Sequence, residues 1–486
     1  MEKFTLKQLV LVTGATGYVG GRLVPRLIEE GISVRVLARD PRRLQGRPWI
    51  SRVQVFQGDV LDAGSLQPAM QDVDTAYYLV HSMSGNQHFY RDDLAAARNF
   101  AFAAAQAGVK RIIYLGGLGN PQDQLSEHLR SRHLTGVALR SENVPVTEFR
   151  AGVIVGLGSL SFEMIQYLTE RLPVMICPRW VYTRTQPISI NDVLDYLVSA
   201  LSTPESIGKV IEIGGADVLS YGEMMSGYAQ VRGLRRSLIP VPVLTPRLSS
   251  YWIHWMTPIP ASIARPLIEG LRNEIVVRSD AAQRIFPQIQ PKGYLQAVQD
   301  ALDPLQSGRM ETYWSDALST SLGDIPPVYL ALDKGMIIER RALEVPAPPA
   351  RVFQVFSGLG GKRGWLAYNF AWWLRGVVDR MIGGVGFRRG RRHPDEIRVG
   401  DALDFWRVEA VEDQHLLRLR AEMKVPGKAW LQFEAHPSGA GQTMLVQTAF
   451  FAPKGLLGLA YWYGLYPIHS LVFSSLVKKI AERASV

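Results

Sequence analysis

Three glycines spaced three residues apart follow an apolar run near the start of the chain. Residues 5–12 have the apolar density of a buried parallel strand, and residues 22–30 repeat apolar side chains at helical spacing. Gly14, Gly17 and Gly20 therefore lie at a strand-to-helix junction. There, free N–H groups at the start of a helix can bind the pyrophosphate of a dinucleotide. The alternative is an ordinary glycine-rich turn.

Each glycine has an expected role in such a junction. Gly14 permits a tight turn, Gly17 allows the backbone to approach a pyrophosphate, and Gly20 lets the helix pack against the strand. The form Thr-Gly-Ala-Thr-Gly-x-x-Gly resembles that of the extended and atypical short-chain dehydrogenase/reductases. This resemblance implies an α/β fold with a doubly wound parallel sheet and an NAD(P) cofactor. The loop residues that we expect to contact the cofactor are Thr13, Gly14, Thr16, Gly17, Tyr18 and Gly20.

Length and composition limit the class of protein further. At 486 residues the chain exceeds one comfortable hydrophobic core, so we expect two domains. Cys177 is the sole cysteine, which excludes an internal disulfide and a cysteine-rich metal site, and we expect no metal. No signal segment is visible in residues 1–8, and the single cysteine suits a reducing compartment, so we expect a cytoplasmic protein.

The formal net charge of +10 allows contact with anionic lipid, nucleic acid or phosphate-bearing ligands. Neither a helix-turn-helix pattern nor a zinc knuckle is present, so we expect no nucleic-acid partner. The densest basic run, Arg388 to Arg392, contains a glycine, and we interpret it as a solvated loop.

The residues after the second predicted strand, 33–37, bear on the choice of cofactor. In this fold an acidic side chain at that place accepts from the ribose 2′-hydroxyl group, whereas an arginine accommodates a 2′-phosphate. Here Ala38 is followed by Arg39, which predicts NADP(H) in preference to NAD(H), with Arg42 or Arg43 in support. The alternative is that these arginines only solvate a loop.

Two more strand ends belong to the expected cofactor site. Residues 53–57 read as a third strand, and the following Gly-Asp-Val segment matches the family's segment beside the adenine, with Asp59 as its polar group and Val60 next to it. Residues 75–80 read as a fourth strand that ends in Leu79 and Val80, which we also expect at the cofactor.

The switch-point rule places residues just past the first and fourth strands at the ligand crevice. His81 and Ser82 follow the fourth strand, so we expect them near the nicotinamide half.

The reductases that this chain resembles place a serine after the fifth strand and then a Tyr-x-x-x-Lys pair, whose tyrosine donates a proton. This chain has Gly-Gly-Leu-Gly at residues 116–119 and lacks the pair. His128 and Arg132 keep its spacing on one helical face. One hypothesis makes His128 the proton donor and Arg132 the residue that holds a ribose or phosphate group. The other makes His128 a surface residue of a site that has lost this chemistry.

The resemblance extends to about Gln306. Arg150 to Gly156 resembles an Arg-then-Gly-x-x-x-Gly segment of atypical members, and the helix near residue 193 has Asn191 or Asp192 as its expected N-cap. A stretch rich in proline and aromatic residues, 240–260, suits an apolar substrate wall, a membrane-facing lid or core between domains.

After a connector, expected at 307–333, the chain changes character at 334–486. It reads as a strand at 336–345, a short helix from about residue 348, alternating strands at 402–411, 416–423, 429–437 and 442–451, and a long apolar segment. This order resembles the helix-grip fold of the START-like superfamily. The sequence segments 400–408 and 461–463 resemble the DUF2867-type C-terminus found on atypical reductases. Such domains enclose a ligand in an apolar cavity, which implies a hydrophobic small-molecule partner.

The segment 455–477 has no Asp, Glu, Lys or Arg and is flanked by lysines. Its length would reach across a bilayer, but Pro467 and His469 interrupt it, and the resemblance makes it the grip helix. A peripheral contact with the inner membrane surface stays open beside a fully cytoplasmic location.

Two functions follow from these observations. In the first, NADP(H) delivers hydride to a hydrophobic carbonyl, enone or quinone, with His81, Ser82 or His128 as the proton donor. In the second, the chain is a non-catalytic redox sensor or assembly factor, like the NmrA-like sensors and complex I accessory subunits among atypical members. The sequence leaves the oligomeric state open.

Overall fold

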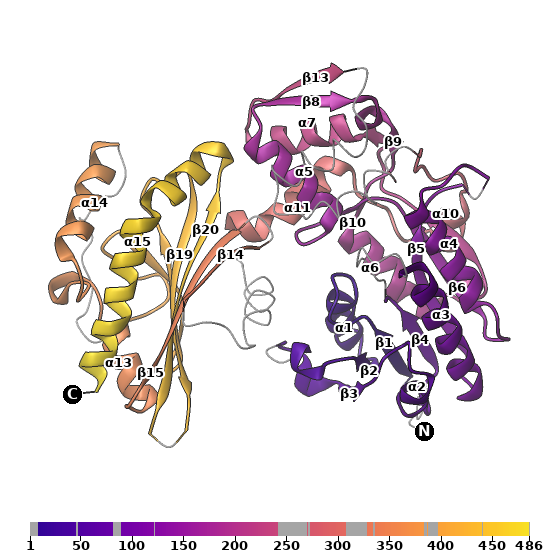
Figure 1. Ribbon diagram of the computed structural model, residues 1–486, viewed down its shortest axis with the longest axis horizontal. Coiled ribbons are helices and arrows are strands. Elements are labelled where there is room, and N and C mark those ends of the chain that lie inside the picture. Colours follow the sequence, from indigo (N-terminus) through magenta and orange to yellow (C-terminus); the bar gives the residue numbers. More distant parts are fainter. Residues whose placement is uncertain are drawn as a thin grey trace. The chain divides into compact units, whose positions relative to one another are not determined.

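The structure is a computed structural model of the 486-residue chain. It describes residues 8–44, 47–80, 89–120, 122–241, 270, 273–307, 328–333, 336–382, 386, 397–439 and 441–485. The described residues fall into two compact units, the first built on a parallel sheet and the second on an antiparallel sheet (Figure 1).

The parallel sheet of the first unit has its strands in the order β11-β6-β5-β4-β1-β2-β3, and every neighbouring pair is parallel. The order reverses between β1 and β4, so the switch point lies at the carboxyl ends of these two strands. The strands are β1 (Leu9–Thr13), β2 (Ser33–Ala38), β3 (Gln54–Gln57), β4 (Thr75–Tyr78), β5 (Arg111–Gly117), β6 (Val146–Ala151) and β11 (Val210–Ile213).

Helices cover both faces of this sheet because successive strand residues point to opposite sides. Val10 and Val12 pack in one core cluster with α1 and α6, and Leu11 packs in another with α2, α3 and α4. The helices are α1 (Gly20–Glu29), α2 (Ala63–Met70), α3 (Phe89–Gln106), α4 (Glu127–Leu139) and α6 (Ile190–Ser199). This arrangement confirms the doubly wound α/β fold.

Shorter elements complete the first unit. They include three two-stranded sheets, β10-β7, β12-β9 and β13-β8. Their strands are β7 (Ile154–Val155), β8 (Val174–Pro178), β9 (Arg184–Thr185), β10 (Ile188–Ser189), β12 (Leu219–Ser220) and β13 (Ser237–Val241); the helices are α5 (Leu160–Arg171), α7 (Tyr221–Arg232), α10 (Ala281–Ile285) and α11 (Tyr294–Ser307). Of the proline-rich stretch expected as a substrate wall, residues 242–260 lie outside the described residues.

The predicted cap of α6 was wrong. Ser189 is the N-cap, and its hydroxyl oxygen accepts from the Asn191 N–H group at 3.2 Å. The helix begins at Ile190, so Asn191 and Asp192 already lie in its first turn. Asp192 is buried and accepts from the Lys292 N–H group at 2.9 Å.

The second unit contains an antiparallel sheet in the order β14-β15-β20-β19-β18-β17-β16. The long helix α15 lies along one face of it (Figure 1), and residues such as Ile337, Leu431 and Phe451 share its core cluster. The elements are β14 (Val328–Asp333), β15 (Met336–Val345), α13 (Pro349–Ser357), α14 (Asn369–Met381), β16 (Ala402–Leu403), β17 (Trp406–Glu412), β18 (Leu416–Ala421), β19 (Gly427–Pro437), β20 (Thr443–Pro453) and α15 (Gly455–Ala484). The expected order of strand, short helix, antiparallel strands and long helix is confirmed.

Three details differ from the sequence pattern. Residues 328–333, within the expected connector, form β14, which pairs with β15. The single strand expected at 402–411 is divided, because Asp404 adopts a left-handed conformation with φ of 53° and turns the chain between β16 and β17. Its carboxylate accepts from Trp365 Nε1 at 2.8 Å. Helix α14 had no counterpart among the predicted elements.

Candidate cofactor and active site

The glycine loop joins β1 to α1 at the switch point. Gly14 has a φ of +75°, and a Cβ atom there would lie 2.5 Å from the Leu79 carbonyl oxygen, at the end of β4. A Cβ atom at Gly20 would collide with the Gly14 carbonyl group. Both positions therefore require glycine, which agrees with the turn and packing roles expected for them.

The start of α1 is suited to an anion. Its N-cap residue, Val19, provides no side-chain hydrogen bond to the first turn. Gly17 is exposed between the turn and the helix, and its N–H group donates to the Gly14 carbonyl oxygen at 2.9 Å. The Gly21 and Arg22 N–H groups donate to the Gly17 and Val19 carbonyl oxygens at 3.0 and 3.1 Å, so the positive end of the helix dipole is what these two residues leave for a phosphate group.

The other residues expected in the loop have different surroundings. Thr13 is buried, and its hydroxyl group donates to the Tyr77 carbonyl oxygen at 2.8 Å, so its side chain ties β1 to β4. Thr16 is half-buried in the loop. The ring of Tyr18 lies under the Arg22 guanidinium group, 4.3 Å from it, and Tyr18 Oη occupies the space that a Cβ atom at Gly156 would need.

Arg39 directly follows β2 and is exposed. The guanidinium nitrogens of Arg47 lie 3.7 and 3.8 Å from the place of a Cβ atom at Gly21, against the first turn of α1. The sequence reasoning missed Arg47, although it belongs to the same arginine-rich loop. The side chains of Arg42 and Arg43 lie outside the described residues.

The segment after β3 is held by hydrogen bonds within its loop. The Asp59 carboxylate accepts from the Leu61 N–H group at 3.0 Å, and the Asp59 N–H group donates to Ser65 Oγ at 2.9 Å. Val60 is buried next to them. These bonds fix the loop beside the end of β2, where the Gly58 N–H group donates to the Ala38 carbonyl oxygen at 3.1 Å.

Leu79 and Val80 are half-buried just past β4, and Leu79 contacts Gly14 as expected for the switch point. His81 and Ser82, expected nearest the nicotinamide, lie outside the described residues. Their roles stay predictions.

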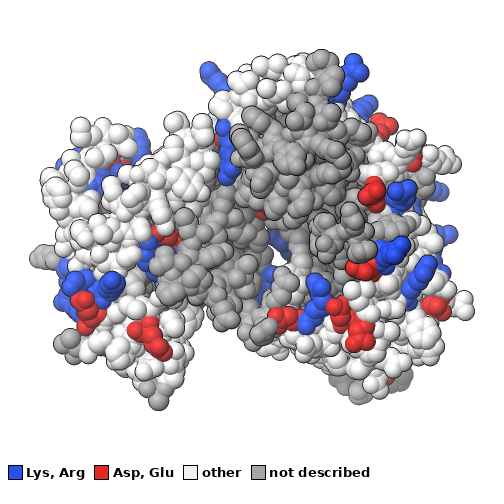
Figure 2. Space-filling view, in the orientation of Figure 1, with Lys and Arg blue, Asp and Glu red and all other residues white. Residues whose placement is uncertain are grey.

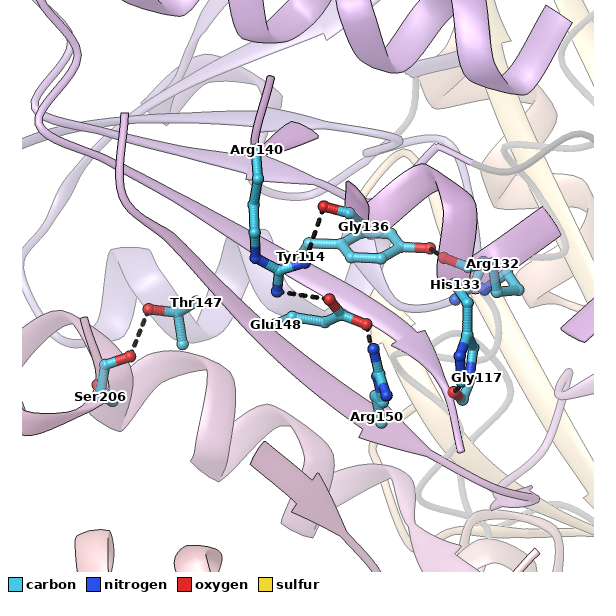
Figure 3. A network of polar contacts seen from close by, with 10 residues as sticks. All are labelled: Tyr114, Gly117, Arg132, His133, Gly136, Arg140, Thr147, Glu148, Arg150 and Ser206. Atoms are coloured by element: carbon cyan, nitrogen blue, oxygen red, sulfur yellow. Dashed lines mark hydrogen bonds and ion pairs between the residues drawn. The ribbon is translucent and has the colours of Figure 1, made fainter. Parts of the chain in front are cut away.

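Helix α4 brings two side chains to the carboxyl end of β5 (Figure 3). Arg132 donates to the Leu115 carbonyl oxygen, and its Cβ atom would lie 3.6 Å from a Cβ atom at Gly117. His133 Nε2 lies 3.1 Å from the Gly117 carbonyl oxygen. His128 lies one turn before Arg132, half-buried in the first turn of α4.

His133 was not among the predicted site residues. Burial and then the positive charge of Arg150 lower its pKa, so the imidazole is neutral near pH 7. Because a carbonyl oxygen only accepts, Nε2 carries the proton, and His133 positions Gly117. His133 lies four residues after the buried Leu129, so the two share the face of α4 that is turned to the sheet. This spacing could have identified His133 from the sequence.

A buried ion-pair network lies behind this end of β5. The Glu148 carboxylate on β6 is fully buried and accepts from Arg140 at 2.6 Å and from Arg150 at 2.6 Å. Figure 3 shows both arginines converging on it, Arg140 from the C-cap of α4 and Arg150 from β6. A Cβ atom at Gly136 would collide with this carboxylate. The network therefore fixes α4 against β6, and with it the positions of Arg132 and His133.

Among the described residues, one group could supply several metal ligands: His415, Glu434 and His436 of the second unit, with ligand atoms within 4.8 Å of one another. His415 Nδ1 already lies 2.7 Å from a Glu412 oxygen, and His436 Nε2 lies 3.4 Å from a Glu434 oxygen. Carboxylates thus partner both rings.

Comparison with protein families adds the chemistry of the ligand. Residues 14–141 match a family described as NAD(P)H-binding, and residues 333–476 match DUF2867, a family of proteins of unknown function. The chain joins an NAD(P)H-binding domain to a DUF2867 domain. This result confirms the cofactor class and the second family that the sequence indicated.

Relatives of the NAD(P)H-binding domain include reductases, hydroxysteroid dehydrogenases and an NADH dehydrogenase subunit of Dictyostelium discoideum. Cinnamoyl-CoA reductase 1 of Oryza sativa is 33% identical over 119 residues, which are 23% of this chain and 35% of that protein. Ceramide reductase of Caulobacter vibrioides is 28% identical over 240 residues, 48% of this chain and 74% of that protein. The chain spans only 30–35% of the length of the first curated relatives that it matches.

The fold recurs in solved structures. An NADPH-dependent quinone oxidoreductase of Escherichia coli, solved with NADPH, aligns with a TM-score of 0.50 at 18% identity, over 60% of this chain and 99% of that one. At this identity the likeness shows the fold alone.

No helix among the described residues is both long and apolar enough to cross a membrane.

Proposed function

We propose that the NAD(P)H-binding domain is an NADPH-dependent reductase of a hydrophobic carbonyl, enone or quinone-like substrate. One observation carries the proposal: α4 delivers Arg132 to the carboxyl end of β5, with His128 one turn earlier on the same helix. In a doubly wound sheet this edge borders the ligand crevice. The reductases among the relatives support the reaction class, and ceramide reductase supports a lipophilic substrate.

The reduced nicotinamide, when bound, supplies the hydride. The chain has to hold the cofactor, exclude competing reactions and deliver one proton to the reduced substrate. Gly14, Gly17 and Gly20 shape the pyrophosphate site, and Arg132 holds a ribose or phosphate oxygen while it stays anchored on Leu115. His128 is the proton donor on the described part of the chain; His133 is excluded because its Nε2–H group donates to the Gly117 carbonyl oxygen.

The second function, a redox sensor without turnover, is favoured by the absence of the Tyr-x-x-x-Lys pair. Glycines occupy the position of the family's serine, so among the described residues at this strand end the candidates for a catalytic side chain come from α4. The two functions differ in one measurable property, the rate at which bound NADPH is oxidised in the presence of a substrate.

The decisive test measures NADPH oxidation by absorbance with a panel of quinones, enones and long-chain aldehydes. We expect turnover above the uncatalysed rate, and a fall in kcat of about 100-fold or more in His128→Gln, because general acids typically contribute that much. Arg132→Met should raise the Kd for NADPH by about 10-fold or more, since it removes a charged hydrogen bond.

The matched control is Arg130→Met, an exposed residue on the same helix, which should change neither constant. Tight NADPH binding without oxidation across the whole panel would exclude the reductase and leave the sensor.

The cofactor preference is a separate expectation. We propose that Arg39 and Arg47 bind the 2′-phosphate of NADPH. Arg39 directly follows β2, Arg47 lies against the first turn of α1, and in this fold the end of the second strand meets the adenosine ribose. Arg39→Ala should lower the ratio of NADPH affinity to NADH affinity by about 10- to 100-fold, since hydrogen bonds to a charged group contribute about 1.5–3 kcal/mol. Calorimetric titration with both cofactors measures the ratio, with the exposed Arg52→Ala as the control. An unchanged ratio in Arg39→Ala would refute this assignment.

A further inference from the structure

The outward face of α14 is apolar. Phe370, Trp373, Leu374, Val378 and Met381 are 71%, 52%, 46%, 45% and 82% exposed, at spacings that place them on one side of the helix. The opposite side is also apolar where it packs, since Trp372 is buried with its ring 6.4 Å from that of Phe473 on α15. A surface helix normally presents polar residues outward. Helix α14 is instead apolar both on its buried side and on its exposed side.

Helix α15 repeats this pattern. Leu456, Leu457, Tyr463, Ile468 and Leu471 are 52%, 77%, 51%, 54% and 55% exposed. The side of the helix toward the sheet is buried through other residues, among them Trp462, Val472 and Leu476. The segment 455–477 has no charged residue on either side.

The two helices are neighbours in the second unit (Figure 1). Figure 2 shows largely uncharged areas on the second unit, with Lys and Arg and some Asp and Glu around them. Monomeric soluble proteins rarely expose a contiguous apolar patch larger than a few hundred Å², and larger patches mark a binding surface.

The charges next to these faces indicate what covers them. Lys454 precedes α15, and Lys478 and Lys479 follow its uncharged part; all three are exposed. At the end of α14, Arg380 is exposed and Lys424 Nζ donates to the Ile382 carbonyl oxygen at 3.1 Å.

Two acidic groups near the same faces already have partners. Asp379, the acidic residue of α14, is buried and accepts from the Gly386 and Lys424 N–H groups at 2.8 and 2.6 Å. Glu482, beyond the uncharged segment, pairs with Lys479 at 2.7 Å. Among the described residues, mainly positive charge therefore borders the apolar faces, which also carry Trp373 and Tyr463. This composition suits the boundary between anionic headgroups and acyl chains.

We propose that the exposed faces of α14 and α15 form a docking surface for an anionic phospholipid membrane. The helices lie in the headgroup boundary, insert the side chains of Phe370, Trp373, Leu457 and their neighbours, and place Lys and Arg against lipid phosphates. Each large apolar side chain that leaves water for the acyl boundary contributes to binding, so a few of them suffice for reversible association. Membrane binding through α14 and α15 does not require the proposed reductase activity. It would, however, hold the NAD(P)H-binding domain near lipid-dissolved substrates.

The test is co-sedimentation of the full chain with vesicles. Phosphatidylcholine vesicles that contain phosphatidylglycerol should carry the protein into the pellet, and high salt or pure phosphatidylcholine should weaken binding. Trp373→Asp and Leu457→Asp should each reduce the partition coefficient by about 10-fold or more, because a charge then replaces an inserted apolar group.

Phe102→Asp is the matched control, since Phe102 on α3 of the first unit is 50% exposed, close to the 52% of Trp373. It should bind vesicles as the unsubstituted chain does, and all three variants should keep the same circular dichroism spectrum. The proposal is overturned if the unsubstituted chain stays in the supernatant, if Trp373→Asp and Leu457→Asp bind normally, or if these variants instead dissociate a lipid-free oligomer.

Discussion

Gly20→Ala should abolish most of the affinity for NADPH while the chain still folds. A methyl group at this position collides with the Gly14 carbonyl group, so the loop must move away from α1. We expect the pyrophosphate to bind at this loop, so the displaced loop would lose its hydrogen bonds to it, and each charged hydrogen bond lost costs about 1.5–3 kcal/mol. We expect the Kd for NADPH, measured by calorimetric titration, to rise by about 10- to 100-fold or more.

Gly64→Ala is the matched control. Gly64 lies in α2, and a Cβ atom there has its nearest contact at 3.4 Å, from the Asp62 side chain. This variant should bind NADPH normally. Gly14→Ala, where φ is +75°, should repeat the loss seen with Gly20→Ala. If both loop variants bound NADPH with unchanged affinity while folded, the glycine loop would not be the cofactor site.

Glu148→Gln should cause the largest loss of stability. The substitution preserves shape but leaves Arg140 and Arg150 without the buried carboxylate that both contact at 2.6 Å. Removal of one partner from a buried ion pair typically costs about 3–5 kcal/mol, because an uncompensated charge stays behind. Chemical denaturation should show this loss, and hydrogen exchange should place it in β5, β6 and α4.

Glu205→Gln provides the comparison, because Glu205 is exposed between α6 and β11. A surface substitution of this kind should change the free energy of unfolding by less than about 0.5 kcal/mol. Equal stability of the two variants would show that the Glu148 network does not hold α4 on the sheet.

Local patterns predicted much of the fold. The strand, glycine turn and helix at residues 9–29 follow from contiguous residues, and alternation predicted β15, β18, β19 and β20. Two predictions failed because of single residues. Ser189, not Asn191 or Asp192, is the N-cap of α6, and Asp404 adopts a positive φ that divides an expected strand. The conformation of Asp404 depends on a residue distant in sequence, because Trp365 Nε1 donates to its carboxylate.

The candidate site was predictable in part. Spacing placed His128 and Arg132 on one face of α4, and the structure shows Arg132 at the end of β5. The structure also brings His133 into contact with Gly117. The family's Tyr-x-x-x-Lys spacing gave no reason to select His133. Arg47 was missed because its place against Gly21 depends on how the loop after β2 folds back.

By itself, the sequence determined the cofactor class and the order of the two folds. The glycine junction and the strand periodicities are local, so each is encoded within a few consecutive residues. Only the tertiary structure decided which face of each helix is covered. An apolar stripe has the same spacing whether it meets a core or solvent, so the exposure of α14 and α15 depends on what packs beside them. Likewise, Glu148 is an isolated acid in the sequence, and it is an ion-pair centre only because α4 and β6 place Arg140 and Arg150 around it.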